Sequence, residues 1–267
     1  MHKFLMVGTG NGGTLDLYNT CFVIQNENGN FLIDTGGSIE IIKRLNHFKI
    51  DYRTLKHIFI SHNHTDHLLG LIWLFKKIGL ASMHGEIYGK IKIYCNDIVF
   101  ESIKEISNLI LPKNIVNEIF NIVVDFVILN NNDSHIVNGI NYTFFDIKAK
   151  GTKQFGFSYN VNEKNIAFLG DETLNPLLYE RFQNFDYIFH EAFCLDSEEH
   201  IFHAYEKNHS TTKSVSIVMN DLNIKNLILY HTEETHGNNR KSLYTSEAQK
   251  YFNGKIIVPE DFDIIEI

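Results

Sequence analysis

Short apolar runs separated by turns rich in Gly and Asn dominate the first quarter of the chain. Their lengths of three to five residues are typical of β-strands, which we expect at residues 3–7, 21–24, 31–33 and 57–60. The Asn28-Gly29 dipeptide between the second and third runs is typical of a hairpin turn. By contrast, apolar residues recur every three positions from Ile39 to Phe48, and this spacing predicts a helix.

The rest of the chain continues to mix strands and helices. Further strands are expected at residues 91–94, 122–128, 142–147, 157–161, 166–169, 187–189 and 227–230. Further helices are expected at residues 68–78, directly after His67, and at 97–111, 113–120, 211–222 and 246–251. Because the strands come in runs, the pattern favours two packed sheets covered by helices over a doubly wound parallel sheet. No linker or repeat divides the chain, so we expect one domain over residues 1–267.

Composition and charge exclude several classes of protein. The net charge of −8, with 24 scattered Lys and Arg, does not predict the basic surface that long nucleic acids need. No apolar stretch approaches the ~20 residues of a membrane-spanning helix and no secretory signal is recognised, so we expect a cytoplasmic chain without membrane contact. Cys21, Cys95 and Cys194 are odd in number and widely spaced, which indicates free or buried thiols rather than disulfides.

Candidate metal ligands are concentrated directly after the apolar run at residues 57–60. Three imidazoles and one carboxylate lie within six positions in the segment Ser61-His62-Asn63-His64-Thr65-Asp66-His67. Imidazole and carboxylate groups are the natural ligands of zinc and similar divalent ions. A loop can turn these side chains toward two neighbouring ions, so the segment predicts a metal site.

This segment resembles the first metal-binding motif of the metallo-β-lactamase superfamily, and within it the ribonuclease Z-like branch of phosphodiesterases. Three further segments carry the resemblance. Residues 31–36 look like the early strand and Asp-x-Gly turn of that superfamily, residues 168–172 like the strand delivering the bridging aspartate, and residues 227–231 like the strand delivering the last metal histidine. The resemblance spans nearly the whole chain and implies a four-layer αββα sandwich with metal ions at the edge between its two sheets.

The resemblance also implies a ligand set for two ions. The expected ligands are His62 and His64 for one ion, Asp66, His67 and His231 for the second, and Asp171 as the bridge. Two ions together lower the pKa of a bridging water and clamp phosphoryl oxygens. We expect one or two Zn²⁺ ions, with Mn²⁺ or Fe²⁺ as alternatives.

Two later segments resemble features of the ribonuclease Z-like branch. His190-Glu191-Ala192-Phe193 is similar to a segment whose glutamate orients a histidine, and His209-Ser210-Thr211 is similar to the segment that carries this histidine. The resemblance implies that Glu191 orients His209 and that His209 protonates the leaving oxygen, while Asp66 orients the attacking hydroxide. An alkoxide departs poorly without such a proton. Ser210 or Thr211 is also a candidate N-cap of the following helix.

The chain departs from the superfamily pattern at one ligand. A third histidine for the first ion is expected at the end of the strand over residues 142–147, and we align Lys148 with that position. A protonated lysine cannot ligate an ion and repels it, so we expect the first ion to bind more weakly than the second. His135 lies in the polar turn before this strand and is the alternative ligand.

The substrate is expected to be small. The tRNA-processing relatives carry a long arm before the bridging aspartate, whereas only the short connection over residues 151–170 is present. Without the arm and a basic surface, docking of folded tRNA is not expected. A small-molecule or short nucleotide phosphodiester is the expected partner, and a homodimer is left open.

Two other functions stay open alongside the phosphodiesterase. A thioesterase or lactonase of the same fold uses the same metal ligands but has no need of Glu191 and His209. A catalytically weak metal-binding sensor would follow if Lys148 has abolished the first metal site. Diiron members are set aside, because they carry a glutamate where this chain has Asp66. Exported antibiotic-degrading members are set aside because no signal peptide is recognised.

Overall fold

The computed structural model describes residues 2–267, which form two compact units, each built on a seven-stranded sheet. The first unit runs up to Gly8 and resumes over Asn19–Leu129 and Asp261–Ile267. The second unit comprises Thr9–Tyr18 and Asn130–Glu260. The expectation of a single domain over residues 1–267 stays a prediction.

The sheet of the first unit changes from antiparallel to parallel pairing along its width. Its order is β14 (Ile264–Glu266), β1 (Lys3–Gly8), β2 (Cys21–Asn26), β3 (Gly29–Ile33), β4 (His57–Ile60), β5 (Ile91–Cys95) and β6 (Val124–Ile128). The pairs from β14 to β3 are antiparallel and those from β3 to β6 are parallel. Parallel strands need long crossovers, and helices supply them here.

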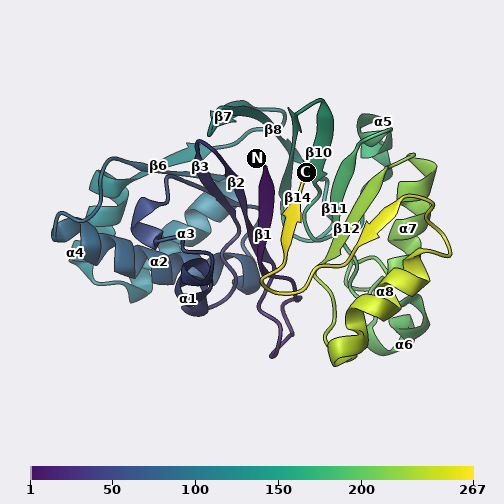
Figure 1. Ribbon diagram of the computed structural model, residues 1–267. Helices are drawn as coiled ribbons and strands as arrows, with labels where there is room; N and C mark the ends of the chain where they lie inside the picture. The colour runs from purple at the N-terminus through teal and green to yellow at the C-terminus, as the bar shows by residue number, and fades with distance from the viewer. Residues whose placement is uncertain (1) are drawn as a thin grey trace. The chain divides into compact units, whose positions relative to one another are not determined.

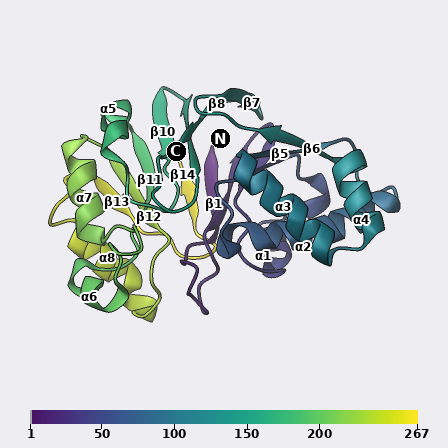
Figure 2. The same ribbon diagram turned by 180° about the vertical axis from the view of Figure 1, so that it is seen from behind.

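Four helices gather on one side of this first sheet (Figures 1 and 2). They are α1 (Glu40–His47), α2 (Thr65–Met83), α3 (Asp97–Ile110) and α4 (Lys113–Asn117), and a π-helical segment follows at Glu118–Val123. Leu71, Phe75 and Ile78 of α2 recur every three or four positions and therefore share one face of the helix. All three side chains are fully buried. This buried face holds α2 in place, and its first turn begins shortly after the end of β4.

The sheet of the second unit has the same alternation of pairing. Its order is β13 (Lys255–Ile257), β12 (Asn226–Tyr230), β11 (Tyr187–Glu191), β10 (Lys164–Phe168), β9 (Phe155–Val161), β8 (Ile140–Asp146) and β7 (Ser134–Val137). The pairs from β13 to β10 are parallel and those from β10 to β7 are antiparallel. The carboxyl ends of β10, β11 and β12 therefore meet at one edge.

Helices α5 (Tyr179–Phe182), α6 (Glu199–Phe202), α7 (Thr212–Asp221) and α8 (Arg240–Ala248) belong to the second unit (Figure 1). Apolar side chains of α7 and α8, including Val215, Met219 and Tyr244, pack into a core with β8, β10, β11 and β12. Thr211 caps α7: its hydroxyl accepts from the Ser214 N–H (3.2 Å), and Ser214 Oγ accepts from the Thr211 N–H (2.9 Å). The predicted N-cap at this position is confirmed at Thr211.

The element boundaries correct several predictions. Helix α2 begins at Thr65 rather than after His67, because His64 already serves as its N-cap and an aspartate is favourable in a first turn. Strand β11 runs to Glu191 rather than ending at 189, because His190 and Glu191 pair with Leu229 and Tyr230 of β12. A partner strand sets that end, and no local pattern reveals it.

The C-terminal helix and three short strands also differ from the predictions. Helix α8 occupies Arg240–Ala248 rather than residues 246–251. Its first turn is anchored by buried Arg240, which donates to Thr232 Oγ1 and the Pro259 carbonyl (both 2.7 Å). Strands β7, β13 and β14 lie outside the predicted elements, because edge strands of three or four residues show too little alternation to be recognised.

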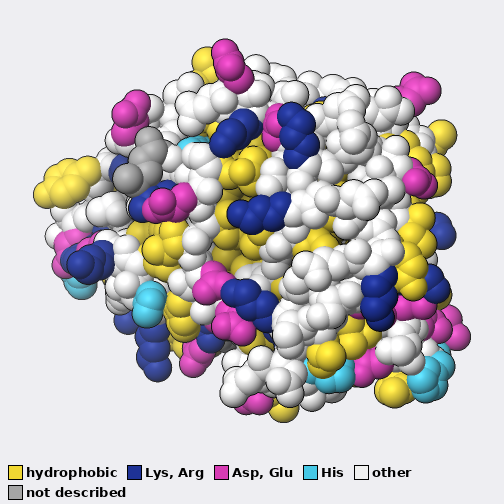
Figure 3. All heavy atoms as spheres, turned by 45° about the vertical axis from the view of Figure 1, so that its right-hand side comes forward, with side chains coloured by type: hydrophobic (Ala, Val, Ile, Leu, Met, Phe, Trp, Pro, Cys, Tyr) yellow, Lys and Arg dark blue, Asp and Glu magenta, His cyan; other side chains and the backbone are white. Residues whose placement is uncertain are grey.

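The predictions made from composition can be compared with this structure. Within residues 2–267, no helix is long and apolar enough to cross a membrane. Cys21, Cys95 and Cys194 are buried free thiols, as expected. On the face drawn in Figure 3, Lys and Arg side chains lie in separate places among acidic and uncharged groups. This face therefore lacks a continuous basic surface.

Candidate metal centre

In each unit, the predicted metal ligands follow the carboxyl ends of parallel strands. In the first unit the ligand segment 61–67 directly follows β4, and Asp34, which is not a predicted ligand, directly follows the neighbouring strand β3. In the second unit Asp171 follows β10 and His231 follows β12. This edge of a sheet is where open α/β sheets commonly place their ligands, since the strands end there together and their loops converge.

Asp34 organises the histidine segment of the first unit. Its Oδ1 accepts from the Ser61 N–H (2.8 Å), and its Oδ2 accepts from the Ser61 hydroxyl (2.7 Å). The same Oδ2 lies 2.8 Å from Nδ1 of His67. Asp34 is 1% exposed and adopts a left-handed φ of 53°. A backbone conformation that is rare outside glycine is maintained here by three hydrogen bonds to the carboxylate.

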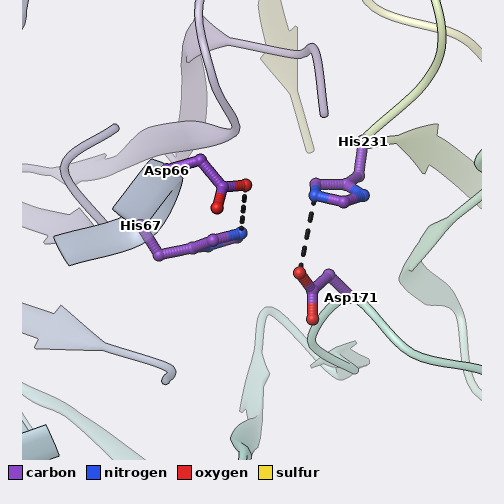
Figure 4. Close-up of side chains that lie close together, drawn as sticks. All are labelled: Asp66, His67, Asp171 and His231. Carbon is purple, nitrogen blue, oxygen red and sulfur yellow. Dashed lines mark ion pairs between the residues drawn. The ribbon is translucent and has the colours of Figure 1, made fainter. Parts of the chain in front are cut away.

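These contacts orient the two buried histidines. With Nδ1 of His67 engaged by Asp34, its Nε2 lies 3.1 Å from Oδ2 of Asp66 (Figure 4). Nδ1 of His62 contacts the Ser61 hydroxyl (3.0 Å). Hydrogen bonding at one ring nitrogen leaves the other nitrogen as a metal ligand, which is how protein metal sites fix the tautomer of their histidines. The rings of His62 and His64 are 4.5 Å apart between centroids.

Helix α2 reaches this site because a glycine permits close packing. The Gly70 N–H donates to the Gly36 carbonyl (2.8 Å), and a Cβ at Gly70 would lie 2.0 Å from the Thr35 carbonyl oxygen. The His67 carbonyl in turn accepts from the Thr35 N–H (3.0 Å) and hydroxyl (2.8 Å). Any larger residue at 70 would push the first turn of α2, and His67 with it, away from Asp34.

The second unit brings Asp171 and His231 together. Nε2 of His231 lies 3.4 Å from Oδ2 of Asp171, and both side chains are 4% exposed (Figure 4). His231 has a left-handed φ of 56°, and the Tyr230 hydroxyl before it donates to the Gly170 carbonyl. A buried carboxylate beside a buried imidazole needs a compensating charge, and a divalent cation supplies one.

Glu191 and His209 also lie beside His231. One ligand atom from each of Glu191, His209 and His231 lies within 4.8 Å of the others. Oε2 of Glu191 is 3.8 Å from Nδ1 of His209, and its carboxylate accepts from the backbone N–H groups of Ser210 (2.5 Å) and Phe193 (3.1 Å). Glu191 thereby holds the loop that carries His209. The structure brings these two residues close together, and the role of Glu191 in orienting His209 stays a prediction.

Burial controls the protonation of this pair. Burial first, and the nearby His231 second, lower the pKa of His209 to about 4. Burial raises the pKa of Glu191 well above its ordinary value, while hydrogen bonds from Ser210 and Phe193 oppose the rise. Both groups thus favour their neutral forms. An anionic molecule beside His209 would shift its pKa upward again.

Phe193 is a contact of His209 that no sequence pattern indicated. Its ring lies flat against the His209 imidazole, with centroids 4.5 Å apart and an angle of 9° between the planes. Lys207 Nζ lies 5.0 Å from the centroid of the same Phe193 ring. The Phe193 carbonyl accepts from the Glu233 N–H (2.8 Å) and the Tyr244 hydroxyl (3.1 Å), so the aromatic platform is held rigidly.

The residue that we aligned with the third histidine has another contact. Nζ of Lys148 pairs with Oδ2 of Asp146 at 3.0 Å, and the Lys148 side chain is 44% exposed. The neighbouring carboxylate therefore offsets its positive charge. His135 lies within strand β7 rather than in a turn before the strand, and its ring packs 6.1 Å from that of Phe144. A ligand role of either residue stays a prediction.

The imidazole and carboxylate side chains of this site are suitable ligands for a divalent metal ion. The structure brings together His62, His64, Asp66 and His67 in the first unit, and Asp171, Glu191, His209 and His231 in the second. Buried imidazole nitrogens and carboxylate oxygens are the ligand types of zinc and related ions. The hydrogen bonds that Asp34 forms with Ser61 and His67 were not predicted from the sequence. The only sign of these hydrogen bonds in the sequence is that an aspartate directly follows a buried strand.

A family model supplies independent information. The model described as Anti-Pycsar protein Apyc1 matches residues 2–244. The chain belongs to this family. Every candidate site residue of this Apyc1 family member lies within the matched region, including both metal-ligand segments and the segments of Glu191 and His209.

Similar proteins agree with the fold of this Apyc1 family member. A ribonuclease Z of Phocaeicola vulgatus is 23% identical in a 309-residue alignment that covers 99% of this chain and 98% of the relative. The metallo-β-lactamase fold protein YhfI of Bacillus subtilis matches with a TM-score of 0.77 at 15% identity, covering 100% of both chains. Zn²⁺-bound PqqB of Methylobacterium extorquens matches with a TM-score of 0.75 at 12% identity, covering 99% of this chain and 100% of that one.

These similarities confirm the superfamily and the fold class. The chain has the αββα metallo-β-lactamase fold, and its relatives include proteins named ribonuclease Z. The fold and the His and Asp clusters together indicate a hydrolase fold with a candidate divalent-metal site.

Proposed function

We propose that the chain is a divalent-metal-dependent phosphodiesterase that hydrolyses a small or short single-stranded phosphodiester. The observation that supports it most directly is the hydrogen bonding behind the histidine segment. Asp34 engages Nδ1 of His67 at 2.8 Å, which leaves Nε2 to bind an ion. Such an arrangement stabilises a metal-ligand geometry and has no comparable value for a surface histidine.

The proposed ligand set is the one that the sequence indicates. His62 and His64 would hold one ion, Asp66, His67 and His231 the other, and Asp171 would bridge them. When bound, the ions would lower the pKa of a water and neutralise charge on the phosphoryl group. We propose Zn²⁺ as the ion, with Mn²⁺ or Fe²⁺ as alternatives. The zinc-bound state of PqqB supports this choice.

The side chains of this chain would move two protons. Asp66 orients the attacking water and accepts its proton while the water oxygen forms a bond to phosphorus. As the bond to the leaving oxygen breaks, His209 donates a proton to that oxygen, and Glu191 keeps its ring in place. Burial lowers the pKa of His209 to about 4, so the negative charge of the bound phosphodiester is needed to keep His209 protonated.

The proposed size of the substrate is based on the net charge of the protein and on the length of the connection between β8 and Asp171. The similarity to proteins named ribonuclease Z supports a phosphodiester. A net charge of −8 and the short connection between β8 and Asp171 favour a small or single-stranded molecule over folded tRNA.

The test combines metal content with turnover. Protein purified without added metal is analysed for bound metal and assayed with bis(p-nitrophenyl) phosphate, a thioester and a lactone. We expect bound divalent metal and preferential phosphodiester hydrolysis, with both reduced in Asp171→Asn and unchanged in the matched exposed control Asp125→Asn. Faster thioester or lactone turnover would support the alternative enzyme, and metal without any turnover would support a sensor.

The proton donor has its own test. His209→Ala should lower kcat about 100-fold for a phosphodiester with a poor leaving group, and much less for p-nitrophenolate, which departs without a proton. An equal loss with both substrates would contradict the role of His209 as an acid.

A further inference from the structure

A cavity of about 310 Å³ in the second unit borders His209. Its walls come from three segments, at residues 148–150, 172–179 and 205–209. Hydrogen bonds join these segments: Asn175 Nδ2 donates to the Lys148 carbonyl (3.2 Å), and the Thr173 N–H donates to the Asn208 carbonyl (3.0 Å). The cavity is therefore a structured part of the fold.

The cavity lies on the leaving-group side of the proposed reaction. Glu172 directly follows Asp171, and its carboxylate accepts from the N–H groups of Lys150 (2.7 Å) and Gly151 (3.0 Å). His209 lies in another wall. Because His209 would protonate the leaving oxygen, the group attached to that oxygen must extend into the space beside His209.

Some of the charged side chains around the cavity already have partners within the protein, and Lys150 does not form an ion pair within residues 2–267. Lys148 pairs with Asp146 at 3.0 Å, and the Glu172 carboxylate is occupied by two backbone N–H groups. Within residues 2–267, Lys150 forms no ion pair, and its side chain is exposed. Lys150 therefore contributes a positive charge that an incoming anion can use.

The remaining walls suit the body of a small organic alcohol. Leu174, Pro176 and Tyr179 contribute apolar and aromatic surface. A volume of about 310 Å³ lies at the lower end of the range of small-ligand pockets, which is roughly 300–1,000 Å³. A single nucleoside or an alcohol of similar size matches this volume, whereas a base-paired helix does not.

We propose that this cavity holds the leaving alcohol of the phosphodiester, of about nucleoside size, and that Lys150 binds phosphate oxygens at its rim. The proposal rests on the proposed function, because it takes His209 as the proton donor. The phosphate oxygens could belong to the scissile phosphate or to a second phosphate on the leaving group. The chemistry is the same, and the experiment distinguishes the two sources.

The test measures inhibition and binding in metal-loaded protein. Adenosine, adenosine 5′-monophosphate and inorganic phosphate are used as inhibitors of bis(p-nitrophenyl) phosphate hydrolysis, and their binding is measured by calorimetry. We expect the monophosphate to bind more tightly than adenosine. Lys150→Gln should weaken its binding about tenfold or more, as expected for a lost charge-assisted contact, and leave adenosine unchanged. Lys90→Gln, an exposed lysine paired with Asp125 in the first unit, is the matched control.

Tyr179→Ala probes the wall of the cavity. It should weaken adenosine and the monophosphate to the same extent and leave inorganic phosphate unchanged, since only the nucleoside contacts the ring. Weaker inorganic phosphate binding in Lys150→Gln would assign the oxygens to the scissile phosphate. An effect on the monophosphate alone would assign them to a phosphate on the leaving group.

Two results would overturn the proposal: monophosphate binding that is the same in Lys150→Gln and wild type, or adenosine binding that Tyr179→Ala does not change. These outcomes are separable from failure of the proposed function. If phosphodiester hydrolysis depends on His209 but binding is independent of Lys150, the cavity proposal alone is wrong. If binding depends on Lys150 but no phosphodiester is hydrolysed, the proposed function is wrong.

Discussion

Replacing Asp34 by asparagine should weaken metal binding although Asp34 is itself no proposed ligand. The substitution keeps the shape of the side chain and Oδ1, which accepts from the Ser61 N–H at 2.8 Å. It replaces Oδ2, which now faces both the Ser61 hydroxyl (2.7 Å) and Nδ1 of His67 (2.8 Å), by an NH₂ group. That group can only donate. The Ser61 hydroxyl can rotate to accept, but His67 can accept only by moving its proton.

The consequence is a change of tautomer at His67. If Nδ1 accepts from the introduced amide, the proton must reside on Nε2, the nitrogen proposed to bind the ion. The ion then has to displace that proton and break the new hydrogen bond. Loss of a hydrogen-bond partner that orients a metal-binding histidine costs about 10- to 100-fold in metal affinity, or about 1.4–2.8 kcal/mol. The loss of hydrogen bonds to a charged group should also lower the free energy of unfolding by about 2 kcal/mol.

The assay is a competition titration of metal-free protein with a chromophoric Zn²⁺ chelator. Urea unfolding first establishes that Asp34→Asn is folded under the conditions used. Asp125→Asn is the matched control, because Asp125 is an exposed aspartate of β6 that pairs with Lys90 at 3.3 Å. Ser61→Ala should show a smaller loss than Asp34→Asn, since the contact of Asp34 with His67 remains. Wild-type affinity in Asp34→Asn would refute the proposal that His67 binds an ion through Nε2.

Three further predictions concern the second unit. Phe193→Leu removes the ring that stacks at 4.5 Å on His209, so kcat should fall about 2- to 10-fold for poor leaving groups while p-nitrophenyl esters are unaffected; Phe193→Trp should restore it, and an equal loss on both substrates would argue for a purely structural ring. Burial lowers the pKa of His190 to about 4, so its contribution to stability is present above pH 6.5 and is lost as pH falls through about 4. Protonation of His190 should therefore lower the free energy of unfolding of metal-free protein by up to about 3 kcal/mol between pH 7 and pH 4. His209, whose pKa is also lowered to about 4, adds to the total fall, so the effect of His190 is read from urea unfolding as the smaller drop in His190→Asn than in wild type. Thr211→Ala removes the N-cap of α7, together with the hydrogen bond that the Thr211 hydroxyl donates to Asp196, and should lower stability by about 1 kcal/mol, whereas Thr211→Ser should not; a normal melting temperature in the alanine variant would show that the Ser214 hydroxyl, which accepts from the Thr211 backbone N–H, holds the loop without the cap.

Local pattern determined much of the fold. The strand at residues 57–60 and the helix that follows were predictable, since an apolar run and a periodic apolar face depend only on residues close together in the sequence. The spacing of His62, His64, Asp66 and His67 indicated metal chemistry for the same reason. The superfamily followed from resemblance between motifs, and the similarity to YhfI confirms the fold.

Tertiary structure alone decided how the site residues are supported. The contact between Asp34 and His67 joins residues 33 positions apart. It exists because β3 and β4 pair in parallel and Gly70 lets α2 approach the turn after β3. The stacking of Phe193 on His209 likewise depends on the carboxyl end of β11 meeting the loop before α7. Strand pairing and helix approach are set by contacts between distant segments, and such contacts leave no periodic signal in the sequence.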